Sequence, residues 1–287
     1  MIPDKFEYFA PPGLPEVLAL LRRYGDDAKV LAGGQSLIPM MKFRLATPGY
    51  LVDLRRVPGL DTLEERGGEL VIGAMTRESA LENSPLVRQR YPALYEATSV
   101  VADPLVRNFA TVGGNLAHAD PANDHPATML ALRAKVVAEG PGGTRVIPID
   151  DFLIDTFETA LAPGEVLVEI HVPQPAPHTG SAYHKLERKV GDFAIAAVAA
   201  QVTLDGGVCT AAGLGLTNVG PKAIRATAAE QHLVGKRLDD TVIREAADLA
   251  AGAAQPTADN RGPVEYKRAM VRTLTARALR AAAARAS

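Results

Sequence analysis

The chain has 287 residues, of which 47% are hydrophobic and 22% are charged, and its 31 basic and 33 acidic residues give a formal charge of −2. This length allows one large domain or two modest ones with a real core. The near-neutral charge offers little attraction to nucleic acid or anionic lipid, so we expect neither partner. The single cysteine, Cys209, excludes an internal disulfide, an intrachain cysteine-ligated iron–sulfur cluster and a cysteine-rich zinc site.

The chain shows no targeting or membrane signal. Its first residues lack the basic segment and apolar run of a secretory signal. The longest apolar stretch, over 193–200, is far shorter than the ~18 residues that a membrane helix needs. We therefore expect a cytoplasmic protein without membrane insertion.

The first fifty residues alternate between strand and helix patterns. Apolar residues at 14, 17, 18 and 21 have helical spacing, and Gly25 follows them as a stop signal. A short strand over 29–32 then runs into a glycine loop at 33–36, after which Pro39 suits the first turn of a helix. This pattern predicts the order strand, glycine loop, helix.

Further along the chain, the apolar pattern predicts mainly strands. The alternation over 166–172 is strict, which is typical of a half-buried strand. Glycines and a proline at 140–143 have the turn chemistry of a hairpin. The predicted elements are strands over 50–54 and 69–72, a helix from about 93, a second glycine segment at 111–115, a hairpin over 134–149 and the strand over 166–172.

Three prolines within 173–177 mark a domain boundary, because proline is excluded from helix interiors and central strands. We place the first domain at 1–175 and the second at 178–287. In the second domain, two apolar runs joined by Asp205-Gly206-Gly207 predict a small antiparallel sheet. Helices are predicted over 224–234, over 239–253 and from 266 onward.

Two glycine pairs carry the most chemical information. Gly33-Gly34 and Gly113-Gly114 lack Cβ atoms, so the backbone can approach a ligand closely and turn its N–H groups toward a diphosphate. Ser36 and Thr111 add hydroxyl groups at the edges. A glycine pair is also a common turn, and this remains the alternative for either pair. Neither a dinucleotide-binding G-x-G-x-x-G nor a phosphate-binding P-loop occurs.

A cluster of polar residues follows the second glycine pair. His118, Asp120, Asp124 and His125 lie within eight residues, but their spacing matches no metal motif, so capping and turn roles are favoured. Cys209 lies in an apolar strand pattern and is predicted to be a core residue. No nucleophile elbow occurs, and we expect no metal site and no catalytic residue on this chain.

Three separated segments resemble one family in the same order. AGGQSLIPMMKFRLATP at 32–48, TVGGNLAHADPANDHPA at 111–127 and KVGD at 189–192 are similar to the FAD-binding medium subunits of the molybdenum hydroxylases. The likeness extends over essentially the whole chain and is strongest to the aerobic carbon monoxide dehydrogenases. It implies an α+β chain, with an N-terminal FAD domain of the vanillyl-alcohol-oxidase (PCMH) type made of two α/β subdomains. A C-terminal three-stranded antiparallel sheet with helices would follow.

The resemblance also implies the cofactor-binding residues. The two glycine segments would hold the FAD diphosphate, Asp124 would accept from a sugar hydroxyl, and Leu167 and Lys185 would approach the isoalloxazine ring. Two positions depart from the family: Gln35 replaces an expected histidine and Phe193 an expected tyrosine. The implied cofactor-binding residues are Ala32, Gly33, Gly34, Gln35, Ser36, Thr111, Val112, Gly113, Gly114, Asn115, Asp124, Leu167 and Lys185.

The activity that the resemblance implies is electron transfer. In the family, substrate is oxidised at a molybdenum cofactor on a large subunit, and electrons cross [2Fe–2S] clusters on a small subunit to reach FAD and then an external acceptor. The subunits would form an (LMS)₂ heterohexamer. The departures at Gln35 and Phe193 keep open a related hydroxylase for N-heterocycles, aldehydes or purines. A flavin-free scaffold and a stand-alone FAD oxidase or reductase are the alternatives from other classes.

Overall fold

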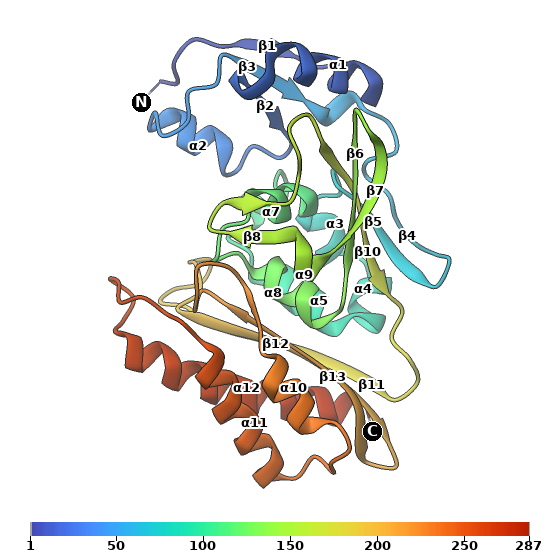
Figure 1. The fold of residues 1–287 in the computed structure, drawn as a ribbon, viewed down its shortest axis with the longest axis vertical. Helices are drawn as coiled ribbons and strands as arrows, with labels where there is room; N and C mark the ends of the chain where they lie inside the picture. The colour runs from blue at the N-terminus through green and yellow to red at the C-terminus, as the bar shows by residue number, and fades with distance from the viewer. Residues whose placement is uncertain (1, 287) are drawn as a thin grey trace.

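The computed structural model describes residues 2–286 and shows an α+β chain whose three larger sheets are stacked along its long axis, beside one two-stranded pair (Figure 1). A small parallel sheet lies at one end, a five-stranded antiparallel sheet lies in the middle, and a four-stranded antiparallel sheet lies at the other end. The predicted fold class is therefore confirmed. No helix within residues 2–286 is long and apolar enough to cross a membrane.

The N-terminal subdomain forms around a parallel sheet with the order β1-β3-β2. The apolar face of α1 buries Val17 and Leu21 against this sheet, and Gly25, with a φ of 54°, ends the helix in a conformation that favours glycine. Its strands are β1 (Glu7–Phe9), β2 (Ala28–Leu31) and β3 (Tyr50–Asp53), and its helices are α1 (Leu14–Tyr24) and α2 (Leu37–Lys42).

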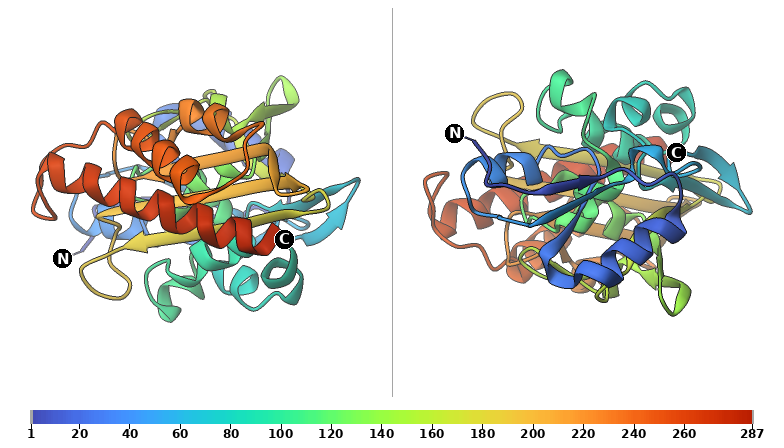
Figure 2. Two further views of the ribbon diagram at one scale, coloured as in Figure 1. Left: turned by 90° about the horizontal axis from the view of Figure 1, so that it is seen from below. Right: turned by 90° about the horizontal axis from the view of Figure 1, so that it is seen from above.

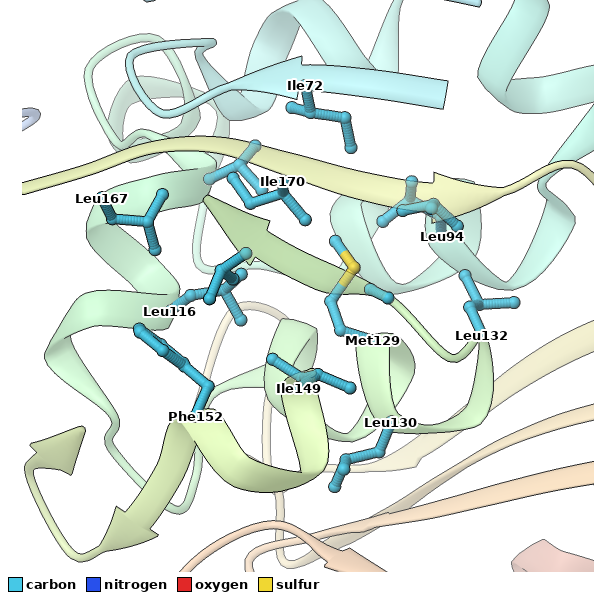
Figure 3. Packing of buried hydrophobic residues seen from close by; sticks show 14 of the residues in the cluster. Ile72, Leu94, Leu116, Met129, Leu130, Leu132, Ile149, Phe152, Leu167 and Ile170 are labelled. Carbon is cyan, nitrogen blue, oxygen red and sulfur yellow. The ribbon is translucent and has the colours of Figure 1, made fainter. Parts of the chain in front are cut away.

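The second subdomain contains the largest apolar core, in which Met129, Ile149 and Phe152 pack beneath the central strand β10 (Figure 3). Its sheet has the order β4-β5-β10-β6-β7. The strands are β4 (Leu63–Arg66), β5 (Glu69–Gly73), β6 (Lys135–Gly140), β7 (Gly143–Pro148) and β10 (Val166–Pro173), beside the short pair β8 (Leu153–Asp155) and β9 (Glu158–Thr159). The helices are α3 (Glu78–Glu82), α4 (Pro85–Arg90), α5 (Pro92–Ser99), α6 (Pro104–Arg107), α7 (Val112–His118), α8 (Asp124–Ala131) and α9 (Ile149–Phe152).

The C-terminal domain follows a segment at 174–178 without helix or strand, and the predicted boundary lies within that segment. Its sheet has the order β11-β12-β13-β14, so the predicted three strands omitted β14, whose two residues are too short to show any alternation. The elements are β11 (Thr179–Leu186), β12 (Ala196–Asp205), β13 (Val208–Thr217), β14 (Ile224–Arg225), α10 (Thr227–Leu233), α11 (Asp240–Ala253) and α12 (Val264–Ala286).

This last sheet is covered by helices on both faces. Helices α10 to α12 lie on the outer face (Figure 2), and α5 and α8 of the preceding subdomain pack on the inner face. Two glycines of β13 make the inner contact possible: a Cβ at Gly213 or at Gly215 would overlap the carbonyl oxygen of Ala131 or of Ala127 in α8. The helix backbone therefore rests directly on the strand backbone, and the two domains form one packed body.

We predict that Gly215→Ala destabilises the whole chain. The added methyl group meets backbone atoms of α8, which cannot rotate away, so the free energy of unfolding should fall by about 1–3 kcal/mol in urea denaturation. Gly252→Ala is the control, because Gly252 lies on the exposed side of α11 with open space around its Cβ position. This control should gain about 0.5–1 kcal/mol from helix propensity. Equal stability of Gly215→Ala and the unmodified chain would disprove the close contact.

Candidate functional site

A cavity of about 920 Å³ runs between the N-terminal subdomain and the second subdomain and is closed at one end by the C-terminal domain. This volume suits a cofactor-sized ligand. All of the predicted cofactor-binding residues except Val112 line it, and Phe193 lines it as well. The structure thus brings residues from 32 to 193 to one place.

The first glycine loop connects β2 to α2, as the sequence predicts. Gly34 has a φ of 74°, which favours glycine, and a Cβ at Gly33 would overlap the backbone carbonyl of Phe109. Gly33 is therefore needed for packing against the protein. Gly34 is needed for the turn that brings the following N–H groups to the cavity wall.

The first loop leaves a row of backbone donors free. Within residues 2–286, the N–H groups of residues 33–37 have no protein acceptor, although the carbonyls of Gly34 and Ser36 accept from Ile38 and Met40 at 3.0 and 3.1 Å. All five residues of this row line the cavity. A cluster of unpaired N–H groups on a cavity wall favours an anionic ligand.

The second glycine segment differs from its prediction, because residues 112–115 form the first turn of α7 instead of a loop. Thr111 is the N-cap, and its Oγ1 accepts from the N–H of Gly114 at 3.2 Å. The N–H groups of Val112 and Gly113 donate to the carbonyls of Thr76 and Ala74. These N–H groups are already satisfied, so they do not provide the free donors that a phosphate-binding loop would.

The second segment contributes space and one acceptor. A Cβ at Gly113 would lie 2.6 Å from the carbonyl oxygen of Ala74, so this glycine allows α7 to pack on the second subdomain. A Cβ at Gly114 would lie 2.8 Å from Oγ1 of the N-cap residue Thr111 and 3.6 Å from the Cβ of Ala32, across from the first loop. The Oδ1 atom of Asn115 is buried without a partner. Such an atom is normally satisfied by a ligand or a water molecule.

Val112 is the exception among the predicted residues. Its side chain is fully buried in the core of the second subdomain and does not face the cavity. The apolar residue after an N-cap is turned inward here because it anchors the first turn of α7. Val112 is therefore not part of the cavity lining.

The C-terminal domain closes the cavity with a polar cluster. Asp124 of α8 is 5% exposed, and its two carboxylate oxygens accept from the hydroxyl of Tyr183 at 2.5 Å and from Nζ of Lys185 at 3.0 Å. Lys185 also donates to the carbonyl of Val100 at 3.0 Å. Burial raises the pKa of Asp124, against the opposing effect of Lys185 and Tyr183.

Tyr183, which donates to Asp124 without itself lining the cavity, was not among the predicted residues. It stands two positions before Lys185 on β11, so the two side chains leave the strand on the same face. That spacing was a usable signal once Lys185 had been identified.

Three further predicted residues occupy separate parts of the wall. Leu167 lies at a β-bulge of β10, where the register shifts between positions 167 and 169, and it is buried in spite of the predicted alternation. Gln35 is exposed on the first loop. Phe193 is 47% exposed, and the guanidinium carbon of Arg261 lies 5.9 Å from its ring centroid.

A buried ion pair lies beneath the second glycine segment. Nε2 of His125 lies 2.6 Å from Oε2 of Glu78, and neither side chain is exposed. Burial alone would lower the pKa of His125, but the charge and the hydrogen bond of Glu78 raise it above its ordinary value. This contact fastens α3 to α8, next to Asp124.

The comparisons with known proteins agree with this geometry. Residues 4–175 match the family model of the FAD binding domain in molybdopterin dehydrogenase, and residues 181–282 match the CO dehydrogenase flavoprotein C-terminal domain. The chain therefore belongs to the FAD-binding subunits of the molybdopterin dehydrogenases, which are oxidoreductases. The resemblance predicted from the sequence is confirmed.

Within this class, the chain is similar to medium chains of carbon monoxide dehydrogenase. It is 47% identical to that of Hydrogenophaga pseudoflava, with 99% of each chain covered, and 44% identical to that of Afipia carboxidovorans, with 100% of this chain and 99% of the relative covered. A solved chain of the Hydrogenophaga pseudoflava enzyme, in a form lacking the Mo-pyranopterin moiety, superposes with a TM-score of 0.98 at 49% identity and full coverage of both chains.

The Glu78–His125 pair predicts a pH-dependent stability. Because the pKa of His125 is raised in the folded state, the pair contributes its full stabilisation of the fold below about pH 6.5, the ordinary pKa of histidine. This contribution is lost as the pH rises through the pKa of the folded state. In that window, the free energy of unfolding should fall by about 1.4 kcal/mol per pH unit for one proton. The double variant Glu78→Gln/His125→Gln should lack this slope in urea denaturation between pH 6 and 9. Equal slopes in the two proteins would refute a charged pair.

Proposed function

We propose that the chain binds FAD in this cavity and carries electrons from the [2Fe–2S] clusters of a partner subunit to an external acceptor. The observation that supports this proposal is that both glycine segments line one cavity and that, among residues 2–286, the N–H groups of 33–37 at the first of them have no acceptor. A diphosphate needs such donors when the site offers little net positive charge. When bound, FAD supplies the ring that accepts and passes on electrons.

The residues present fit that cofactor. The N–H groups of 33–37 would hold the diphosphate, and the absent Cβ of Gly114 would leave room for it. The buried Oδ1 of Asn115 needs a donor, which a sugar hydroxyl provides. Asp124 keeps free lone pairs for a second hydroxyl, since Tyr183 and Lys185 each occupy one.

The flavin end of the cofactor would lie toward the C-terminal domain. Lys185 would favour negative charge on the isoalloxazine ring, because a cation beside the ring stabilises it. Leu167 would provide an apolar wall, and Phe193 would shield a ring face without donating a hydrogen bond.

The metal centres would belong to partner subunits. Cys209 is buried in the C-terminal core with its Sγ toward the carbonyl of Ala211, and one thiol cannot hold a [2Fe–2S] cluster. The relatives are named medium chains, which implies companion chains. We infer a large subunit with the molybdenum cofactor and a small iron–sulfur subunit, in a cytoplasmic (LMS)₂ heterohexamer.

Gly114→Val tests the cofactor site. The branched side chain would fill the space between the two glycine segments, so FAD affinity should fall at least about a hundredfold, or about 2.8 kcal/mol, in fluorescence titrations. The matched control is Gly252→Val, on the exposed side of α11, which should bind FAD as the unmodified protein does. Unchanged affinity in Gly114→Val would remove this site assignment. If the unmodified protein contains no FAD, either alone or with its partner subunits, the flavin-free scaffold becomes the favoured function.

Co-purification tests the electron-transfer role. When the chain is produced together with the large and small subunits encoded beside it, the three should elute as one complex that contains molybdenum, iron and FAD. This complex should oxidise carbon monoxide with a dye as electron acceptor. Activity confined to N-heterocycles, aldehydes or purines would assign the complex to the related hydroxylases that Gln35 and Phe193 keep open. A single chain that oxidises its own substrate would disprove the subunit role.

A further inference from the structure

Tyr183 occupies an unusual position between the two domains. Its ring is 5% exposed and lies in a cluster whose other buried members, within residues 2–286, are all alanines. These alanines come from α5, from α8 and from 194–199 of the C-terminal domain: Ala93, Ala97, Ala131, Ala194, Ala197 and Ala199. Because their side chains are small, both helices approach the sheet closely around this one ring.

The backbone of Tyr183 is fixed by hydrogen bonds, as its ring is by packing. Its N–H donates to Oε2 of Glu96 at 2.8 Å, and the other oxygen of Glu96 accepts from Arg285 at 2.6 Å. Arg285 also donates to the carbonyl of Ser181, whose hydroxyl accepts from the N–H of Ala93 at 3.2 Å. Helix α5 thus contacts β11 both at Ser181 and at Tyr183 itself, which fixes the backbone that carries the ring.

The hydroxyl of Tyr183 ends at the cofactor cavity. It donates to Oδ1 of Asp124 at 2.5 Å, while Lys185 donates to Oδ2 at 3.0 Å. Asp124 and Lys185 line the cavity, whereas Tyr183 is not among the described residues that line it. The tyrosine therefore contacts the carboxylate from behind, on the side away from a ligand.

We propose that Tyr183 is a positioning residue that fixes the orientation of the Asp124 carboxylate toward the ligand. Cofactor binding then depends on the packing of the C-terminal domain, which carries Tyr183. The inference rests on the proposed function, since it assigns the ligand of Asp124 to FAD. A carboxylate held by two donors from one rigid strand has a single orientation. Without the hydroxyl, Asp124 keeps only the flexible lysine as a side-chain partner.

Tyr183→Phe tests this inference, because it keeps the ring and removes only the hydroxyl. The FAD dissociation constant should rise roughly tenfold to a hundredfold, which corresponds to one hydrogen bond to a charged group. Tyr91→Phe is the matched control: Tyr91 is 2% exposed and donates to Glu65 at 3.1 Å, and it is not among the described cavity residues. This control should bind FAD like the unmodified protein.

The same variant in an Asp124→Asn background separates positioning from packing. If Tyr183 acts through Asp124, its removal should change FAD affinity less than about twofold once Asp124 is replaced. Additive losses, or an unchanged dissociation constant in Tyr183→Phe alone, would overturn the proposal. The FAD content of the unmodified protein, measured alone and with its partner subunits, tests the proposed function separately.

The pH at which FAD is released gives a second test, because a residue that acts only by packing would not change it. Loss of the hydroxyl removes a group that stabilises the carboxylate, so FAD release on acidification should begin at a higher pH in Tyr183→Phe. If the variant and the unmodified protein release FAD at the same acidic pH, the proposal is contradicted. The other titratable groups around Asp124 are kept in both proteins: Lys185 from β11, Glu187 directly after β11, His125 from α8 and Glu78 from α3.

Discussion

The contact between α8 and β13 determines the rest of the architecture. Glycines at 213 and 215 let the carbonyls of Ala131 and Ala127 lie directly against the strand, and any side chain there would separate the two domains. This close approach places β11 beside α5 and brings Lys185 to Asp124. The closed end of the cavity therefore depends on a backbone contact far from the glycine loops. The wall of the cavity is thus completed by the packing of the C-terminal domain as well as by the loops.

The two glycine segments have different physical roles, although they look alike in the sequence. The N–H groups of 33–37 in the first have no acceptor among residues 2–286, while the N–H groups of Val112 and Gly113 in the second donate to Thr76 and Ala74. Gly33 and Gly113 are fixed by contacts with Phe109 and Ala74. Thus Gly33 and Gly113 allow close contacts between backbone segments, whereas a Cβ at Gly34 or Gly114 would meet the side chain of Ile38 or of Thr111.

Much of this could be predicted from the sequence, for identifiable reasons. The strand, glycine loop and helix at 29–42 and the hairpin around 140–143 follow from local turn chemistry and apolar spacing. The helical start at Val112 was missed because a glycine pair after threonine suits a turn as well as an N-cap. The bulge at Leu167 and the hydrogen bond from Tyr183 to Asp124 depend on partners distant in the chain, which periodicity does not reveal. Strand β14 was missed for another reason, since its two residues are too few to show an alternation.

The hydrogen bonds of Asp124 also bear on how such a chain can be divided. The proline-rich segment at 174–178 is the place where the backbone passes between the domains. A crossover there, in nature or in a chimera, would take Tyr183 and Lys185 from one parent and Asp124 from the other. The β13 glycines would likewise have to meet an α8 of matching shape. The linker separates the two domains along the chain, but the contacts of Asp124 with Tyr183 and Lys185 join them. A chimera that keeps these contacts must therefore take both domains from the same parent.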